Sequence, residues 1–265
     1  MTTLDEYNNY GEELERLLLL RTSPIAVKML EKEEDIPEGA IRPKRDHGYH
    51  LAQCQAFAMS RRQRVTVAIL KEDNWCWAPL IAFGLVKPPD IFLEGKTSFP
   101  YMVANQEAAK ELAETFPCLE FGKYVGIVSA PLKTASFKPD LVLIYSNTAQ
   151  LRTLLLAVKY KEGRLVESQF DPIDSCIYST VPVLLTGQYR ITLPDPGDYQ
   201  RALAGEDEII FSVPKDKLET IILGLRHFEE MNHGYTQHTM EMRPNFPQPE
   251  FYKEFFKMWG LDVGE

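Results

Sequence analysis

Cysteine is the residue type in this chain best suited to chemistry, because its thiolate is both a nucleophile and a ligand for soft metals. The 265 residues include four cysteines, Cys54, Cys76, Cys118 and Cys176. No two of them form a Cys-x-x-Cys pair, so the spacing of a zinc ribbon or a ferredoxin is not present. Any shared site must therefore come from a fold that brings distant segments together.

Three of the cysteines lie at expected helix starts. Cys76 directly precedes a helix that we expect to begin near Pro79, and Cys54 and Cys176 fall in the first turns of helices expected over 51–59 and 171–185. The positive end of a helix dipole favours a thiolate, so the pattern indicates a thiolate site. The alternative is that these cysteines are small buried hydrophobic residues, which is also our interpretation of Cys118.

The densest basic cluster follows the first cysteine helix at Arg61, Arg62 and Arg64. Guanidinium groups bind carboxylates and phosphates through two parallel hydrogen bonds. We therefore predict that Arg61 and Arg62 line a cleft near Cys54 and bind a small anionic molecule. The alternative is a solvated turn between a helix and a strand.

Composition excludes several classes of partner. Acidic residues outnumber basic ones by 38 to 29, a formal net charge of −9, which repels nucleic acid and anionic membranes. No apolar run approaches the roughly 20 residues that span a bilayer, and the first residues do not resemble a signal peptide. We expect a cytoplasmic protein whose thiols stay reduced. No P-loop, Rossmann fingerprint, Gly-x-Ser-x-Gly elbow or His-Glu-x-x-His motif is present.

The elements that must position these residues read as an α/β (mixed α+β) fold. Short apolar runs rich in β-branched residues predict strands over 25–29, 65–70, 125–129, 141–145 and 208–213. Helices are expected over 4–20, 105–114, 147–159, 214–225 and 250–259. A strand–helix–strand passage over 141–167 predicts a mixed sheet flanked by helices. We expect one compact domain, with an α/β part over 1–226 and an extension over 227–265 that packs on it as a wrapping segment plus a helix.

The chain from Leu20 to about Arg226 resembles the domain-of-unknown-function 169 family, found mostly in anaerobic bacteria and archaea. The resemblance is carried by dispersed stretches: Leu20-Arg21-Thr22-Ser23-Pro24-Ile25-Ala26-Val27-Lys28, Cys54-Gln55-Ala56, Asn74-Trp75-Cys76-Trp77-Ala78-Pro79, Ala82-Phe83-Gly84-Leu85, Ala130-Pro131-Leu132, Phe137-Lys138-Pro139-Asp140, Thr148-Ala149-Gln150 and the run over 208–214. It implies family cysteines at Cys54, Cys76 and Cys176. A further family cysteine often lies in a Pro-Cys-x-Gly-Asp turn, where this chain has Asp195.

These observations predict that Cys54, Cys76 and Cys176 converge and ligate a [4Fe–4S] cluster, with Asp195 as the fourth group; zinc is the alternative metal. The first hypothesis is an iron–sulfur protein of anaerobic redox metabolism, and its finer form is an enzyme with an open cluster site for a small anionic substrate. A small-molecule-binding or accessory module with structural cysteines is the second. The family resemblance implies no reaction, so catalysis and homo-oligomer formation stay open.

Overall fold

The computed structural model describes residues 2–236 and 250–261. The chain divides into two compact units, Met1–Tyr235 and Thr236–Glu265. The second unit has one described helix, α12 (Glu250–Met258), close to the helix expected over 250–259. The predicted wrapping segment over 227–249 extends into residues 237–249, which lie outside the described part. The predicted boundary at residue 226 falls within the last long helix of the first unit.

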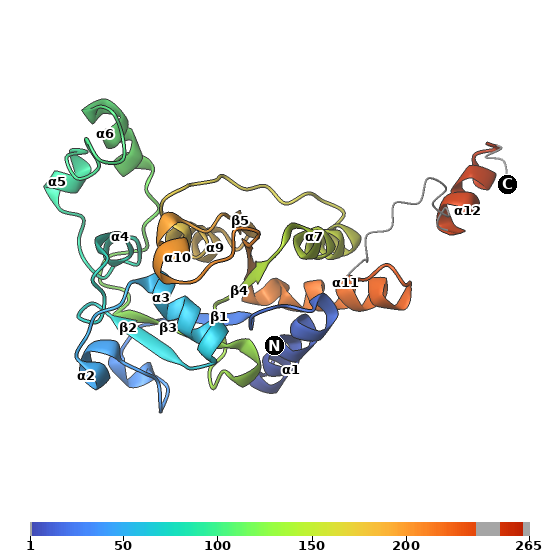
Figure 1. The fold of residues 1–265 in the computed structure, drawn as a ribbon, viewed down its shortest axis with the longest axis horizontal. Helices are drawn as coiled ribbons and strands as arrows, with labels where there is room; N and C mark the ends of the chain where they lie inside the picture. Colours follow the sequence, from blue (N-terminus) through green and yellow to red (C-terminus); the bar gives the residue numbers. More distant parts are fainter. Residues whose placement is uncertain (1, 237–249, 262–265) are drawn as a thin grey trace. The chain divides into compact units, whose positions relative to one another are not determined.

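The first unit is built around one six-stranded sheet with the order β2-β3-β1-β4-β6-β5 (Figure 1). Its strands are β1 (Ile25–Leu30), β2 (Val67–Leu70), β3 (Gly126–Pro131), β4 (Leu141–Ser146), β5 (Arg190–Thr192) and β6 (Ile209–Pro214). The mixed α/β class is confirmed, and five of the strands lie where the apolar runs placed them. Every ladder between these strands is antiparallel, so the predicted mixed sheet is wrong.

The error lies in the segment after the long helix α7 (Thr148–Glu162). Residues 165–167 were expected to form a strand, but they run as irregular chain and Leu165 is 79% exposed. Both sides of β4 are already occupied, by β1 and by β6, so no place beside it is left for a parallel strand. The sheet is instead completed by the short strand β5 at the edge of β6.

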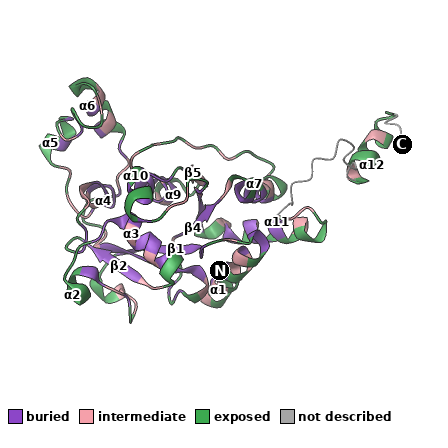
Figure 2. Cartoon of the chain, in the orientation of Figure 1, coloured by how far each residue is buried: buried purple, intermediate pink, exposed green. Residues whose placement is uncertain are grey.

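Both faces of the sheet are covered by helices, which explains why the strands are apolar at nearly every position. Alternate residues of β4 face opposite sides: Val142 and Ile144 join one core cluster, and Leu141, Leu143 and Tyr145 join the other. Figure 2 shows the central strands buried along most of their length, whereas the short edge strand β5 is only partly buried. The first face is covered by long helices, α1 (Leu4–Leu18), α7 (Thr148–Glu162) and α11 (Leu218–Glu230).

Short helices cover the second face and carry the cysteines. They are α3 (Gln53–Ala58), α4 (Trp77–Ala82), α8 (Ser175–Tyr178), α9 (Val181–Thr186) and α10 (Pro196–Arg201). The helix expected over 171–185 is divided in two, because Pro182 stands in the first turn of α9 and offers no N–H to continue α8. The remaining short helices are α2 (Pro43–His47), α5 (Asp90–Leu93) and α6 (Gln106–Thr115), with single turns at Glu33–Asp35, Leu132–Thr134 and Lys215–Lys217.

Candidate functional site

Three short helices bring the three cysteines into one neighbourhood. Helix α8 packs against both α3 and α4. The segments leading into α3 and α4 are tied by a parallel bridge, in which the Trp75 N–H donates to the carbonyl of Leu51 at 3.2 Å. Cys54 is buried, and half-buried Cys76 packs against the small apolar cluster that contains Cys54 and Ala202. Cys176 is buried at the start of α8.

The thiols are close enough to affect one another electrostatically. Burial raises the pKa of the Cys176 thiol well above its usual value, and Cys54, Asp195 and Cys76 raise it further. Burial, with the charges of Asp198 and Asp195, raises the pKa of Cys54 to about 12. Without a bound cation these groups are therefore neutral thiols, not thiolates. The pKa of Cys118 is raised by burial alone, so this cysteine belongs to no such cluster.

Asp195 lies beside the cysteines, but its carboxylate is occupied. It caps α10, where Oδ1 accepts the Asp198 N–H at 2.9 Å. Oδ2 accepts both the N–H and the hydroxyl of Ser175, each at 3.0 Å, and so joins α10 to the start of α8. The Pro-Asp-Pro-Gly-Asp sequence thus forms a capping box, in which Asp198 returns a bond to the Asp195 N–H at 3.2 Å. In this geometry Asp195 is a structural carboxylate, and its role as a fourth ligand is not supported.

Two further carboxyl groups surround the thiols. Burial and the charges of Asp171 and Asp195 raise the pKa of Asp174 to about 7. Burial and Asp195 raise the pKa of Asp198 to about 6, opposed by its hydrogen bond from Ser175. Because these carboxyl groups are buried close together, it is unfavourable for all of them to be ionised at once. A positive charge nearby would stabilise their ionised forms.

Arg61 and Arg62 take different places because they lie in a π-helical turn, Met59–Gln63, which rotates one of them inward. Arg61 is 1% exposed, with its guanidinium 4.0 Å from the centre of the Tyr145 ring. It forms a two-pronged pair with Glu208, at 3.0 and 3.1 Å. Arg62 is exposed, donates to the Leu203 carbonyl and lies 3.7 Å from a carboxylate oxygen of Glu208. Neither lines a described groove, so anion binding by this pair stays a prediction.

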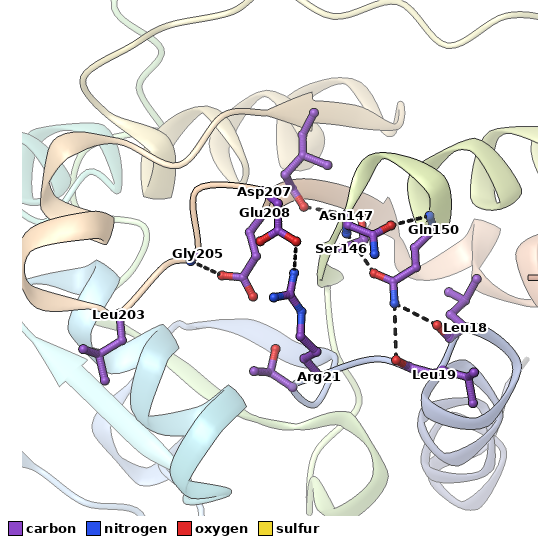
Figure 3. Close-up of polar contacts among 12 residues, drawn as sticks. Leu18, Leu19, Arg21, Ser146, Asn147, Gln150, Leu203, Gly205, Asp207 and Glu208 are labelled. Atoms are coloured by element: carbon purple, nitrogen blue, oxygen red, sulfur yellow. Dashed lines mark hydrogen bonds and ion pairs between the residues drawn. The ribbon is translucent and has the colours of Figure 1, made fainter. Parts of the chain in front are cut away.

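Glu208 holds Arg61 from a tight loop at the start of β6. Its carboxylate also accepts the Gly205 N–H at 2.9 Å, and the exposed pair of Arg21 with Asp207 lies beside it (Figure 3). In the same view, Gln150 joins α7 to the end of α1 by donating to the Leu18 carbonyl at 2.8 Å. The Gly205 contact holds the carboxylate of Glu208 in place for Arg61, whereas the Gln150 contact joins two helices of the first face.

Arg201 is the arginine at the cysteines, and the sequence interpretation missed it. Its guanidinium lies over the Trp75 indole, 5.0 Å from the ring centre, and its nearby charge opposes the rise in the pKa of Cys54. A Cβ at Gly197 would meet the Arg201 Nη2 at 2.4 Å, so glycine there lets the side chain fold back over the first turn of α10. The signal was available, since Gly197 and Arg201 are four residues apart on one helical face.

Two buried amides beside the cysteines have unpaired atoms. Asn74 Oδ1 accepts the Cys76 N–H at 2.8 Å, but its Nδ2 has no partner. Gln53, next to Cys54, is 1% exposed and its Oε1 has no partner. Buried polar atoms are rarely left unpaired in proteins, so these two mark a place where a further group can bind.

Neither a formed metal site nor a membrane-spanning helix occurs in residues 2–236 and 250–261. No set of three or more His, Cys, Asp or Glu side chains there has the spacing that holds a metal ion. No helix in the same residues combines the length and apolarity needed to cross a bilayer. An open groove of about 640 Å³ lies away from the cysteines, lined by basic and acidic side chains together, among them Lys28, Lys123, Asp140 and Lys215.

The fold and site define a class: an antiparallel α/β protein with three cysteines gathered on one face of its sheet. The chain belongs to the DUF169 family, described as uncharacterised ArCR, whose model matches residues 13–224. It is 25% identical over 233 residues to an uncharacterised protein of Methanocaldococcus jannaschii, covering 86% of this chain and 97% of that protein. No solved structure matches the chain significantly.

Proposed function

We propose that this protein is a thiolate-based metal protein in which Cys54, Cys76 and Cys176 hold an iron–sulfur cluster or another soft metal centre. The observation that supports the proposal is that Cys54, Cys76 and Cys176, which are distant in the sequence, lie in one neighbourhood of the fold, where helix α8 contacts both α3 and α4. Free cysteines are common as small buried residues, so burial accounts for each of them singly, and a second reason is needed for three of them to lie together. Metal binding is such a reason, because several soft sulfur ligands are then needed together.

The donor set fits a soft metal, and the surrounding charge favours a cation. The thiols lie among Asp174, Asp195 and Asp198, with Arg201 as the cation near Cys54 and Cys76. A bound metal would supply the positive charge that lets the thiols deprotonate. Since no ready ligand set exists in the described residues, binding would have to draw the three thiols together.

Asp195 does not fit as the fourth ligand, because it already caps α10 and binds Ser175. A site with three protein thiolates leaves one position for an outside ligand. Such a position is what metal enzymes use to bind a substrate. We therefore assign the metal site to the three cysteines alone and keep a small anionic substrate as the proposed occupant of the open position.

A second candidate is a small-molecule-binding or accessory module with structural cysteines. One observation favours it: the charge of Arg201 lies near Cys54 and Cys76 and opposes the rise in the pKa of both thiols, so this place has a cation of the protein without a metal. In that case the cysteines are packing groups, and the protein is colourless as isolated.

Metal analysis of anaerobically purified protein separates the two candidates. The metal proposal expects a brown protein with iron and acid-labile sulfide, or a colourless one with about one zinc per chain. Cys76→Ala should remove the metal, and Cys118→Ala is the matched control that should retain it. A folded parent protein that holds neither metal after anaerobic reconstitution would overturn the metal proposal and support the second candidate.

A further inference from the structure

Arg201 is exposed and forms no ion pair within the described residues, although the chain is acidic. By contrast, many arginines of the chain are paired with carboxylates: Arg16, Arg21, Arg42, Arg45, Arg61, Arg164 and Arg226. An unpaired guanidinium fixed in place is a ready receptor for an anion. The Arg201 guanidinium is held over the indole of Trp75.

Trp75 supplies an aromatic surface at the same place. It is 51% exposed, which is unusual for tryptophan, and it directly precedes Cys76. An exposed indole beside an arginine can stack on a planar group of a ligand while the guanidinium binds the ligand's charge.

Asn74 adds a buried hydrogen-bond donor beside Cys76. The residue is only 6% exposed, and its amide is held beside Cys76 by the bond from the Cys76 N–H. Its Nδ2 is a buried donor without an acceptor. A buried donor left unpaired costs about 1–3 kcal/mol, which an acceptor on a ligand would recover.

We propose that Arg201, Trp75 and Asn74 form a binding site, next to Cys76, for a small anion that carries a planar group. The inference deepens the proposed function, since this anion would be the occupant of the open position at the thiol site. Arg201 binds the charge, Trp75 stacks on the planar group, and Asn74 donates to an oxygen of the anion. It replaces the predicted role of Arg61, whose guanidinium is held by Glu208.

The nearby carboxylates do not block this site. The oxygens of Asp195 accept N–H groups of Ser175 and Asp198, and Asp198 accepts the Ser175 hydroxyl and the Asp195 N–H. These bonds turn both carboxylates toward the joint between α8 and α10. The Arg201 guanidinium, in contrast, extends onto Trp75. Repulsion between these carboxylates and a bound anion lowers the affinity, but the Arg201 guanidinium is still available to bind the anion.

Titration calorimetry with phenylphosphate, benzoate and inorganic phosphate tests the site on the full chain. Phenylphosphate should bind most tightly, because it alone combines a doubly charged group with a ring. Arg201→Gln should weaken it at least about tenfold, the loss expected for a charge-assisted bond. Trp75→Leu should reduce the preference for phenylphosphate over inorganic phosphate. Arg152→Gln removes another exposed, unpaired arginine, on α7, and should change nothing.

Three outcomes would overturn the proposed site. The parent protein binds neither phenylphosphate nor benzoate, the affinity of Arg201→Gln for phenylphosphate stays within twofold of that of the parent, or Arg152→Gln loses as much affinity as Arg201→Gln. Iron, sulfide and zinc are measured on the same preparations. A metal-free parent that binds phenylphosphate through Arg201 refutes the metal centre and supports the anion site. A metal-loaded parent protein whose affinity for phenylphosphate is unchanged in Arg201→Gln supports the metal centre and refutes the anion site.

Discussion

Arg61 and Glu208, 147 residues apart in the chain, form a two-pronged ion pair in the core, with guanidinium to carboxylate distances of 3.0 and 3.1 Å. Their side chains are 1% and 3% exposed. The pair joins the π-helical turn after the cysteine helix α3 to the loop before β6. It therefore holds together two segments that flank the proposed site.

Removing one partner of this pair should strongly destabilise the fold, because the other charge is left buried and unpaired. We expect Arg61→Ala or Glu208→Gln to lower the free energy of unfolding by about 3–5 kcal/mol in urea titrations. The control is Arg21→Ala, which breaks the exposed pair with Asp207 and should cost about 0–1 kcal/mol. Equal effects of the two arginine variants would show that Arg61 contributes no more than a surface charge.

Asp195 should behave as a helix cap and not as a metal ligand. Asp195→Ala should lower the free energy of unfolding by about 1–2 kcal/mol or more, since it removes the α10 cap and the bonds to Ser175. Asp195→Asn keeps an oxygen for the Asp198 N–H and should cost less. Metal content per folded chain should be the same in both variants. Loss of metal in folded Asp195→Asn protein would restore Asp195 as a ligand.

Gly197→Ala should move Arg201 while leaving the fold nearly intact. The new methyl group would meet the end of the flexible Arg201 side chain at 2.4 Å, which can swing away, and the Asp195 Oδ1 at 2.9 Å, which must shift slightly. The better helix propensity of alanine offsets the cost of that shift. We expect a change in unfolding free energy below about 1 kcal/mol and a loss of phenylphosphate affinity similar to that of Arg201→Gln. Gly187→Ala, at a glycine with open space around it but φ of +62°, should show the opposite pattern: lower stability and unchanged affinity.

Asp174 should make the fold less stable as the pH rises. Its pKa in the folded protein is about 7, above the usual carboxyl value, so the folded state binds more protons than the unfolded state between about pH 4 and pH 7. Stability from this group is then fully present below that window and is lost as the pH rises through it.

We therefore expect Asp174→Asn to gain about 2 kcal/mol of unfolding free energy relative to the parent between pH 5 and pH 8. Denaturant titrations at several pH values measure this difference. Glu206→Gln, a change at an exposed acid, is the control and should follow the parent curve. A pH-independent difference between Asp174→Asn and the parent would show that Asp174 ionises normally.

Local sequence patterns were sufficient to predict the positions of most individual helices and strands. β1, β4 and β6 begin within one residue of the positions expected from their apolar runs, because a strand buried on both faces must be apolar throughout. Asn105 and Asn147 mark the starts of α6 and α7, since their side chains accept N–H groups of the first turn. Cys54, Cys76 and Cys176 were placed at helix starts on the same local grounds.

Partners across the chain were decided only by the tertiary structure. The sequence cannot say that β1 and β6 occupy both sides of β4, and this is why a parallel strand at 165–167 was expected and is not present. It gave Arg61 and Arg62 equal roles, whereas the π-helical turn buries one against Glu208 and leaves the other near the surface. Arg201 is placed at the cysteines by the packing of α10 on α3. Periodicity and capping depend on residues within one or two turns, but pairing depends on which faces meet after folding.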